Sequence, residues 1–213
     1  MDRLEIGLWH LELRGKRCVE SLRKNGFDAV FLPDRESVRS RLLSECEKAA
    51  SIGFGGSMSI SEMGIHEALA GKGKRLLDHG RVPPGEKVST RLGQLTCDLF
   101  LSGTNAVTLN GCLVNLDMTG NRTNAMTFGP KKIVVVAGAN KIVADVAEGM
   151  RRIKSMVAPR NARRLQLSTP CAATGFCSDC DSPQRICRVY SIIERKPPNS
   201  DITVIVCGEP MGL

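Results

Sequence analysis

The chain has 213 residues, of which 42% are hydrophobic and 24% are charged, a composition that excludes a disordered or collagen-like protein. The length suits one domain. The net charge is +8, but the basic residues are dispersed and aromatic residues make up only 4%, so we expect no nucleic-acid partner. No apolar run is long enough for a membrane span and the N-terminus lacks the pattern of a secretory signal, so we expect a cytoplasmic protein.

The first half of the chain predicts helices that alternate with strands. Leu11, Cys18 and Leu22 recur at helical spacing and predict a helix over residues 2–25. The elements expected to follow are a strand over 28–32, a helix capped by Asp34, a strand over 51–54, a helix from a Ser59–Glu62 capping box to about residue 70, a strand over 74–78 and a helix from Pro83 to about residue 96.

The second half is richer in strands. A helix is expected over 141–157, with Pro159 as its end. The Asn110-Gly111 dipeptide is typical of a tight turn between two strands. The alternation predicts one α/β domain over residues 1–213, with a mostly parallel sheet and some antiparallel pairs. Its later strands are expected over 98–101, 106–109, 112–116, 132–137 and 202–207.

A glycine turn after the strand over 51–54 is the first candidate ligand site. Gly55 and Gly56 let a ligand approach the backbone closely, and Ser57 adds a hydroxyl donor. Free N–H groups at the start of the next helix favour an anion such as phosphate or carboxylate. The alternative is a purely structural turn, since the motif matches neither the dinucleotide-binding fingerprint nor the Walker A motif.

A stretch rich in Asn, Thr and Gly, over residues 102–124, is the second candidate. It supplies uncharged donors and acceptors and one fixed cation, Arg122. Such side chains at the strand ends of an open α/β sheet predict a polar ligand pocket, whereas the alternative is a set of hairpin turns in which Asp117 caps or pairs with a neighbour. The candidate ligand-binding residues of both stretches are Gly55, Gly56, Ser57, Ser102, Gly103, Thr104, Asn105, Asn110, Gly111, Asn115 and Arg122.

Three motifs, GFGGSMSISEMG from Gly53, DLFLSGTNAVTLNGCLVNLD from Asp98 and GPKKIVVVAGANKIV from Gly129, resemble in this order the lactate-utilisation (LUD) domain family. The resemblance covers about residues 10–207. It implies a Rossmann-like, CoA-transferase-like fold with helices on both faces of a mostly parallel sheet, in the fold group of glucosamine-phosphate deaminase and ribose-phosphate isomerase. It also implies a cleft between the glycine turn and the strands from Gly103 to Gly111, and a link to lactate oxidation beside iron–sulfur partner proteins.

Two acidic residues, Glu62 and Asp117, are the candidates for catalysis. CoA-transferases of the implied fold use a glutamate just before a comparable glycine motif, and Leu109 stands at that position here, so we expect no covalent CoA transfer. Glu62 has an alternative role as the capping-box partner of Ser59. The sequence leaves open whether the protein is an enzyme.

Four cysteines lie close together in a loop over about residues 168–190, namely Cys171, Cys177, Cys180 and Cys187. Four thiolates complete a tetrahedral Zn²⁺ site or hold a four-iron cluster, and Cys177 and Cys180 have the usual chelate spacing. The alternatives are disulfides, which the cytosol disfavours, and a redox-active dithiol without metal. We expect a [4Fe–4S] cluster, with Zn²⁺ as the alternative, and expect the other five cysteines to be small buried hydrophobic residues.

Two classes of function follow from these features. The first is a protein of lactate-type carboxylate metabolism or redox metabolism, which binds a small anionic metabolite in the cleft. The alternative is a non-catalytic electron-transfer or regulatory subunit that docks an iron–sulfur or dehydrogenase partner subunit. Ligand-dependent thermal stabilisation favours the first class, and the visible absorbance of a cluster favours the second.

Overall fold

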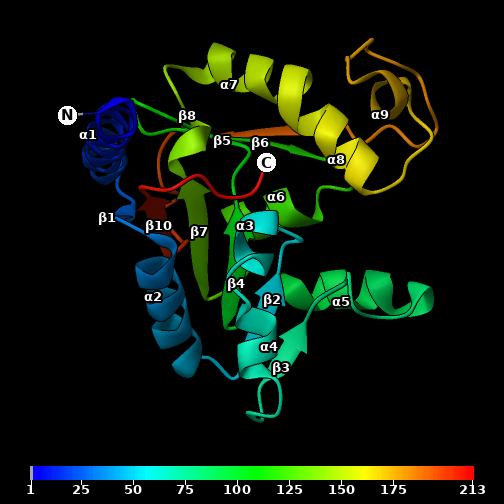
Figure 1. Ribbon diagram of the computed structural model, residues 1–213. Coiled ribbons are helices and arrows are strands. Elements are labelled where there is room, and N and C mark those ends of the chain that lie inside the picture. The colour runs from blue at the N-terminus through cyan, green and yellow to red at the C-terminus, as the bar shows by residue number, and fades with distance from the viewer. Residues whose placement is uncertain (1) are drawn as a thin grey trace.

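The computed structural model describes residues 2–213 and arranges them as two β-sheets with helices around them (Figure 1). The larger sheet is parallel throughout, in the order β1 (Asp28–Leu32), β10 (Ile202–Cys207), β7 (Lys132–Gly138), β4 (Leu99–Gly103), β2 (Ser51–Phe54) and β3 (Arg75–Leu77). The smaller sheet mixes parallel and antiparallel pairs, in the order β8 (Ile142–Val143), β5 (Ala106–Thr108), β6 (Leu113–Asp117) and β9 (Val189–Ile193). The predicted Rossmann-like α/β fold is confirmed.

Helices cover both faces of the larger sheet. On one face α1 and α6 pack together with the smaller sheet, and on the other face lie α2, α3 and α4. In Figure 1, α7 and α8 cross the outer side of the smaller sheet, and α5 extends sideways near β3. No helix within residues 2–213 is long and apolar enough to cross a membrane. The helices are α1 (Arg3–Lys24), α2 (Arg35–Glu47), α3 (Met58–Ser61), α4 (Ile65–Leu69), α5 (Lys87–Gln94), α6 (Asn121–Thr127), α7 (Val146–Arg152), α8 (Ala158–Arg164) and α9 (Pro170–Thr174).

Strand β7 lies in the middle of the larger sheet and is buried on both faces. Ile133 and Val135 face the core that α1 covers, whereas Val134 and Val136 face the core that α2 covers. All four side chains have 0% exposure. Burial of each contributes about 1.5–3 kcal/mol, so the uninterrupted apolar run that predicts this strand is also a main source of its stability.

The starts of the helices show where local signals decide the structure and where they do not. Asp34 caps α2 as predicted, because its carboxylate accepts a hydrogen bond from the N–H of Ser37 at 2.7 Å. The predicted capping box of Ser59 and Glu62 does not form, because α3 begins at Met58. The Ser59 hydroxyl accepts a hydrogen bond from Lys141 instead, and the Glu62 carboxylate accepts one from the N–H of Gly212.

The helix predicted over 141–157 differs from the structure at both ends. Lys141 lies in a 3₁₀ turn and β8 follows it, so the helix begins at Val146 after the capping residue Asp145. It then continues through Pro159 to the end of α8. A proline ring normally collides with the carbonyl four residues earlier. A wider π-helical turn over Ile153–Val157 directly precedes Pro159 and accommodates the ring, so the helix does not end there.

The predicted tight turn at Asn110-Gly111 joins β5 to β6 and packs against α1. The N–H of Gly111 donates to the carbonyl of Thr108 at 2.9 Å, and its φ of +83° lies in the left-handed region. A Cβ at Gly111 would lie 2.6 Å from the backbone carbon of Ser21. Asn25, just after α1, donates to the carbonyls of both turn residues. Gly111 is therefore required by backbone conformation and by close packing together.

We expect Gly111→Ala to lower the free energy of unfolding by more than about 2 kcal/mol, since left-handed strain adds to a backbone overlap. Gly73→Ala is the matched control, because Gly73 also has positive φ (+69°) but has open space around it. Its expected loss is about 1 kcal/mol, from strain alone. Urea denaturation of both variants measures the difference, and equal losses would contradict the packing role of Gly111.

Candidate functional site

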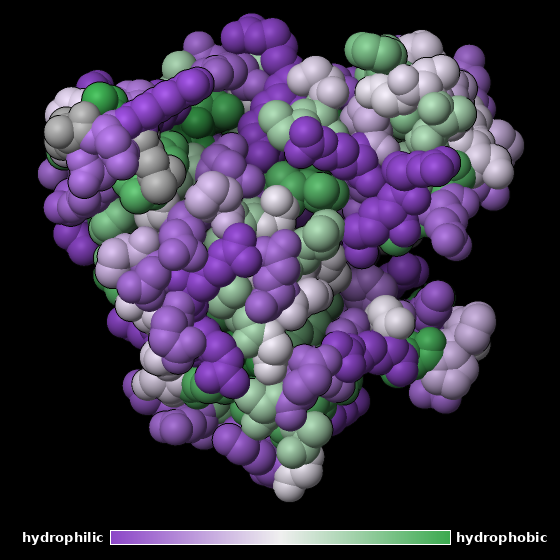
Figure 2. Space-filling model, in the orientation of Figure 1, coloured by the Kyte–Doolittle hydropathy of each residue, from purple (hydrophilic) through white to green (hydrophobic). Residues whose placement is uncertain are grey.

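A cavity of about 370 Å³ lies where β2, β4 and β6 end, a size that suits a small metabolite. Figure 2 shows the molecule hollowed between the ends of α8 and α5, with hydrophilic residues around the hollow. The side chains that line the cavity include five basic residues and one acidic residue, namely Lys87, Arg91, Arg122, Lys141, Arg164 and Asp117.

The glycine turn forms one wall of the cavity. The N–H of Gly55 donates to the carbonyl of Leu101 at 2.9 Å, which holds the turn against β4. A Cβ at Gly103 would collide with the hydroxyl of Ser57, so this glycine lets the turn and β4 lie in contact. The Ser57 hydroxyl makes no capping hydrogen bond, and α3 has only four residues. The charge of a helix terminus therefore contributes little here, and the polar groups that this wall presents are its hydroxyl and backbone groups.

Arg122 joins the two sheets on the opposite wall. Its guanidinium donates to the carbonyl of Leu116 at 2.8 Å and to the side-chain oxygens of Asn115 at 2.7 Å and Asn105 at 3.1 Å. A longer bond of 3.3 Å reaches the carbonyl of Gly103, at the end of β4. Burial lowers the pKa of Arg122, which nevertheless stays charged because arginine starts from so high a value.

Asp117 is engaged by backbone groups and is not a free carboxylate. One of its oxygens accepts from the N–H groups of Arg122 and Thr123, both at 3.1 Å, and the other accepts from the N–H of Met118 at 2.8 Å. Asp117 thus holds the start of α6 in place, as the structural alternative for this residue predicts. The carboxylate keeps its charge and favours the charged form of Arg122, but it is the one acidic side chain against five basic ones among the described residues that line the cavity.

The structure brings most of the predicted ligand residues together, although it leaves ligand binding itself a prediction. Two of them lie behind the wall, since Ser102 donates to the carbonyl of Gly103 and Asn115 accepts from Arg122. Asn110 and Gly111 lie in the turn against α1 and do not line the cavity. Glu62 does not line it either. The predicted residues that do are Gly55, Gly56, Ser57, Gly103, Thr104, Asn105, Asp117 and Arg122.

Several residues that line the cavity were not predicted as site residues, because no sequence motif identified them. His79 follows β3, and the side-chain amide of Gln94 lies 3.1 Å from its Nδ1 while also donating to the carbonyls of Phe54 and Leu77. Burial and the neighbouring Arg91 lower the pKa of His79, which favours the neutral ring. Lys141 lies in the third motif of the LUD resemblance, and that motif could have identified it as a site residue.

Lys141 is 4% exposed, and its Nζ donates to the hydroxyl of Ser59 at 2.9 Å. Burial lowers its pKa to about 7, with further lowering from Arg152 and Arg122 and opposition from Glu62. A lysine in this state exists partly as a free amine at neutral pH. Lys141 is therefore able to act as a nucleophile in the cavity, and the neutral ring of His79 is able to act as a base there.

The cysteines fall into two groups, as the sequence predicts. Cys18, Cys46, Cys97, Cys112 and Cys207 are buried free thiols, whereas Cys171, Cys177, Cys180 and Cys187 lie in the loop after α8 and are partly or fully exposed. Arg185 supports this loop by donating to the carbonyls of Cys180 and Cys187, and its guanidinium also pairs with Asp179. Within residues 2–213 no three His, Cys, Asp or Glu side chains are placed to hold a metal ion.

These features define an α/β protein with a small cleft at the carboxyl ends of its parallel strands. The model of the LUD domain family matches residues 15–207, and the chain belongs to that family. The crystal structure of a DUF162 family protein from Deinococcus radiodurans is similar over 97% of this chain and 99% of that chain, with 13% sequence identity and a TM-score of 0.49. No curated protein matches the chain.

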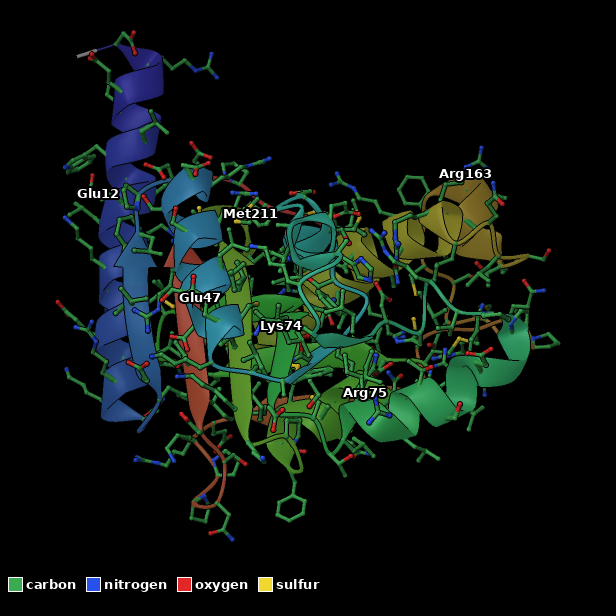
Figure 3. The ribbon with its side chains drawn as sticks, turned by 90° about the horizontal axis from the view of Figure 1, so that it is seen from below. Glu12, Glu47, Lys74, Arg75, Arg163 and Met211 are labelled. Atoms are coloured by element: carbon green, nitrogen blue, oxygen red, sulfur yellow. The ribbon has the colours of Figure 1, made fainter. Side chains whose placement is uncertain are left out.

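We expect Arg122→Met to lower the free energy of unfolding by about 3 kcal/mol or more, because buried carbonyl and amide oxygens lose a charged donor. Arg122→Lys keeps the charge but loses the planar fork, so an intermediate loss is expected. Arg163, labelled in Figure 3 on α8, is exposed, and Arg163→Met should change stability by less than about 0.5 kcal/mol. Urea denaturation ranks the three variants, and a neutral Arg122→Met would refute the structural role.

Proposed function

We propose that the chain binds a small organic anion, a carboxylate or phosphate metabolite of the lactate type, in the cavity between the glycine turn and Arg122. The observation that carries this proposal is the charge of the lining: five basic side chains surround the cavity, and Asp117 is the one acidic side chain among them. An excess of positive charge that is partly removed from water is costly, and a bound anion offsets that cost.

The uncharged groups of the cavity suit the same ligand. Ser57 offers a hydroxyl with no capping partner, and the Nε of Arg91 is buried without a hydrogen-bond partner. An anion with several oxygens can accept hydrogen bonds from both groups, because carboxylate and phosphate oxygens accept more than one bond each. We therefore assign Arg91 and Ser57 to hydrogen bonding with the ligand. Arg122 attracts the ligand through its charge, because its two Nη atoms already donate to protein oxygens.

Ligand binding should appear as thermal stabilisation. We expect lactate, pyruvate or a small phosphate ester to raise the melting temperature, since a ligand at a hundred times its dissociation constant adds about 2.7 kcal/mol. Arg91→Met should reduce the shift without a large loss of intrinsic stability, because Nε has no protein partner to lose. Arg163→Met is the matched control and should keep the shift. No response to a broad panel of acids, sugar phosphates and CoA esters would refute the proposal.

A second proposal concerns the loop over residues 168–190: it binds a metal centre, a [4Fe–4S] cluster or alternatively Zn²⁺, through Cys171, Cys177, Cys180 and Cys187. Two observations support it. Within residues 2–213, only these four cysteines are outside the core. Burial raises the pKa of Cys187, and the thiols of Cys177 and Cys171 lie near enough to raise it further against the effect of Lys154 and Arg185. The thiols do not converge as they stand, so binding requires the loop to close around the metal.

Metal analysis of protein prepared anaerobically tests this second proposal. We expect about four iron atoms and sulfide with a broad visible absorbance that bleaches on reduction, or one zinc atom and no colour. Cys177→Ala should abolish the metal, whereas the buried Cys46→Ala should retain it at some cost in stability. A cluster would favour an electron-transfer or regulatory subunit that docks an iron–sulfur dehydrogenase. Metal-free protein in which a thiol reagent labels all four of these cysteines would overturn the proposal.

A further inference from the structure

We propose that Lys141 is a nucleophile that forms an imine with small anions carrying an aldehyde or ketone group, such as a 2-oxo acid. This inference rests on the proposed anion-binding function and narrows the ligand class. It assigns to the cavity a covalent step that neither Glu62 nor Asp117 can supply, because an imine forms from a primary amine and a carboxylate has none.

The position of Lys141 is the first argument. The 3₁₀ turn η2 (Ala139–Lys141) follows the central strand β7 and places the side chain on the cavity wall. Among the lysines within residues 2–213, only Lys141 is buried. No carboxylate of these residues lies within ion-pair distance of its Nζ. The partner of Nζ is the uncharged hydroxyl of Ser59, which does not require an ammonium group. Lys141 can therefore lose its proton without breaking an ion pair.

The charges around Lys141 are the second argument. Arg122 and Arg152 are cations that lie near enough to disfavour the ammonium form, and Glu62 is the anion that opposes them. Arg152 is fixed there by a bond of 2.6 Å to the carbonyl of Asn105. An ordinary lysine with a pKa of about 10.4 is almost entirely protonated at neutral pH, whereas one near 7 is half unprotonated. Desolvation beside other cations is a known way to activate a lysine amine for imine formation.

The chemistry needs no further reactant. The amine nitrogen attacks the carbonyl carbon, and one amine proton moves to the carbonyl oxygen. Loss of that oxygen as water, together with the second amine proton, leaves the neutral C=N bond, so atoms and electrons balance. The hydroxyl of Ser59, 2.9 Å from Nζ, can pass the proton. Arg91 lines the same cavity and can hold the carboxylate or phosphate group of the ligand, and the charge of Arg122 attracts that group.

Reductive trapping on the full chain tests the proposal. The protein is incubated with pyruvate at pH 7 and reduced with sodium cyanoborohydride, and the adduct is located by peptide mass mapping. We expect one reduced pyruvate adduct on Lys141. Lactate, which has a hydroxyl in place of the ketone, should shift the melting temperature but give no adduct. Lys141→Arg keeps a cation and should lose the adduct, whereas the exposed Lys16→Arg should retain it.

The melting temperature is measured on the same samples, so that the two proposals fail in different ways. A thermal shift with no adduct, or with adducts spread over exposed lysines, overturns the imine and leaves anion binding intact. If no oxo acid gives either a thermal shift or an adduct, both proposals are overturned. Peptide mapping of the wild-type protein tests the imine even if Lys141→Arg fails to fold, because it locates the reacting amine directly.

Discussion

The guanidinium of Arg122 holds together the point at which the two sheets meet. The chain leaves β4 at Gly103 and enters β5 at Ala106, so two residues carry it from one sheet to the other. Arg122 donates to the carbonyl of Gly103 on one side of this crossing and to that of Leu116 on the other, and Arg152 fixes the crossing itself through the carbonyl of Asn105. Buried carbonyls need partners, so the shape of the cavity depends on these two cations.

The buried arginines that fix the strand ends also place positive charge beside the other groups of the cavity. Burial and the positive charges of these arginines together lower the pKa of Lys141. The same charges act on any ligand that enters the cavity. The carboxylates of Asp117 and Glu62 oppose these charges but do not cancel them, because five basic side chains and one acidic side chain line the cavity. Arg122 and Arg152 thus support the strand ends and also help to lower the pKa of Lys141. The stability of the fold and the reactivity of the cleft therefore depend on the same charges.

The sequence predicts the parts of this structure that depend on local patterns. β7 is recognisable because both of its faces are buried, and α2 because Asp34 caps it. The prediction failed at Ser59, where a side chain from a distant element, Lys141, replaced the local capping partner. His79 and Arg91 escaped prediction for a related reason: they come from separate elements, and only the folding of the sheet brings them to one cavity. A single sequence contains no local signal for such convergence.

The π-helical turn over Ile153–Val157 has a consequence for how this cleft tolerates insertions and deletions. A π turn is equivalent to one extra residue in an α-helix, and each residue rotates the helix by about 100°. Ile153 and Val157 line the cavity within the turn, and Asn161 and Arg164 line it beyond the turn. Deleting one residue within the turn would therefore convert it into regular α-helix, and Asn161 and Arg164 would keep their orientation toward the cleft. In a regular α-helix the same deletion would rotate every later residue by about 100°.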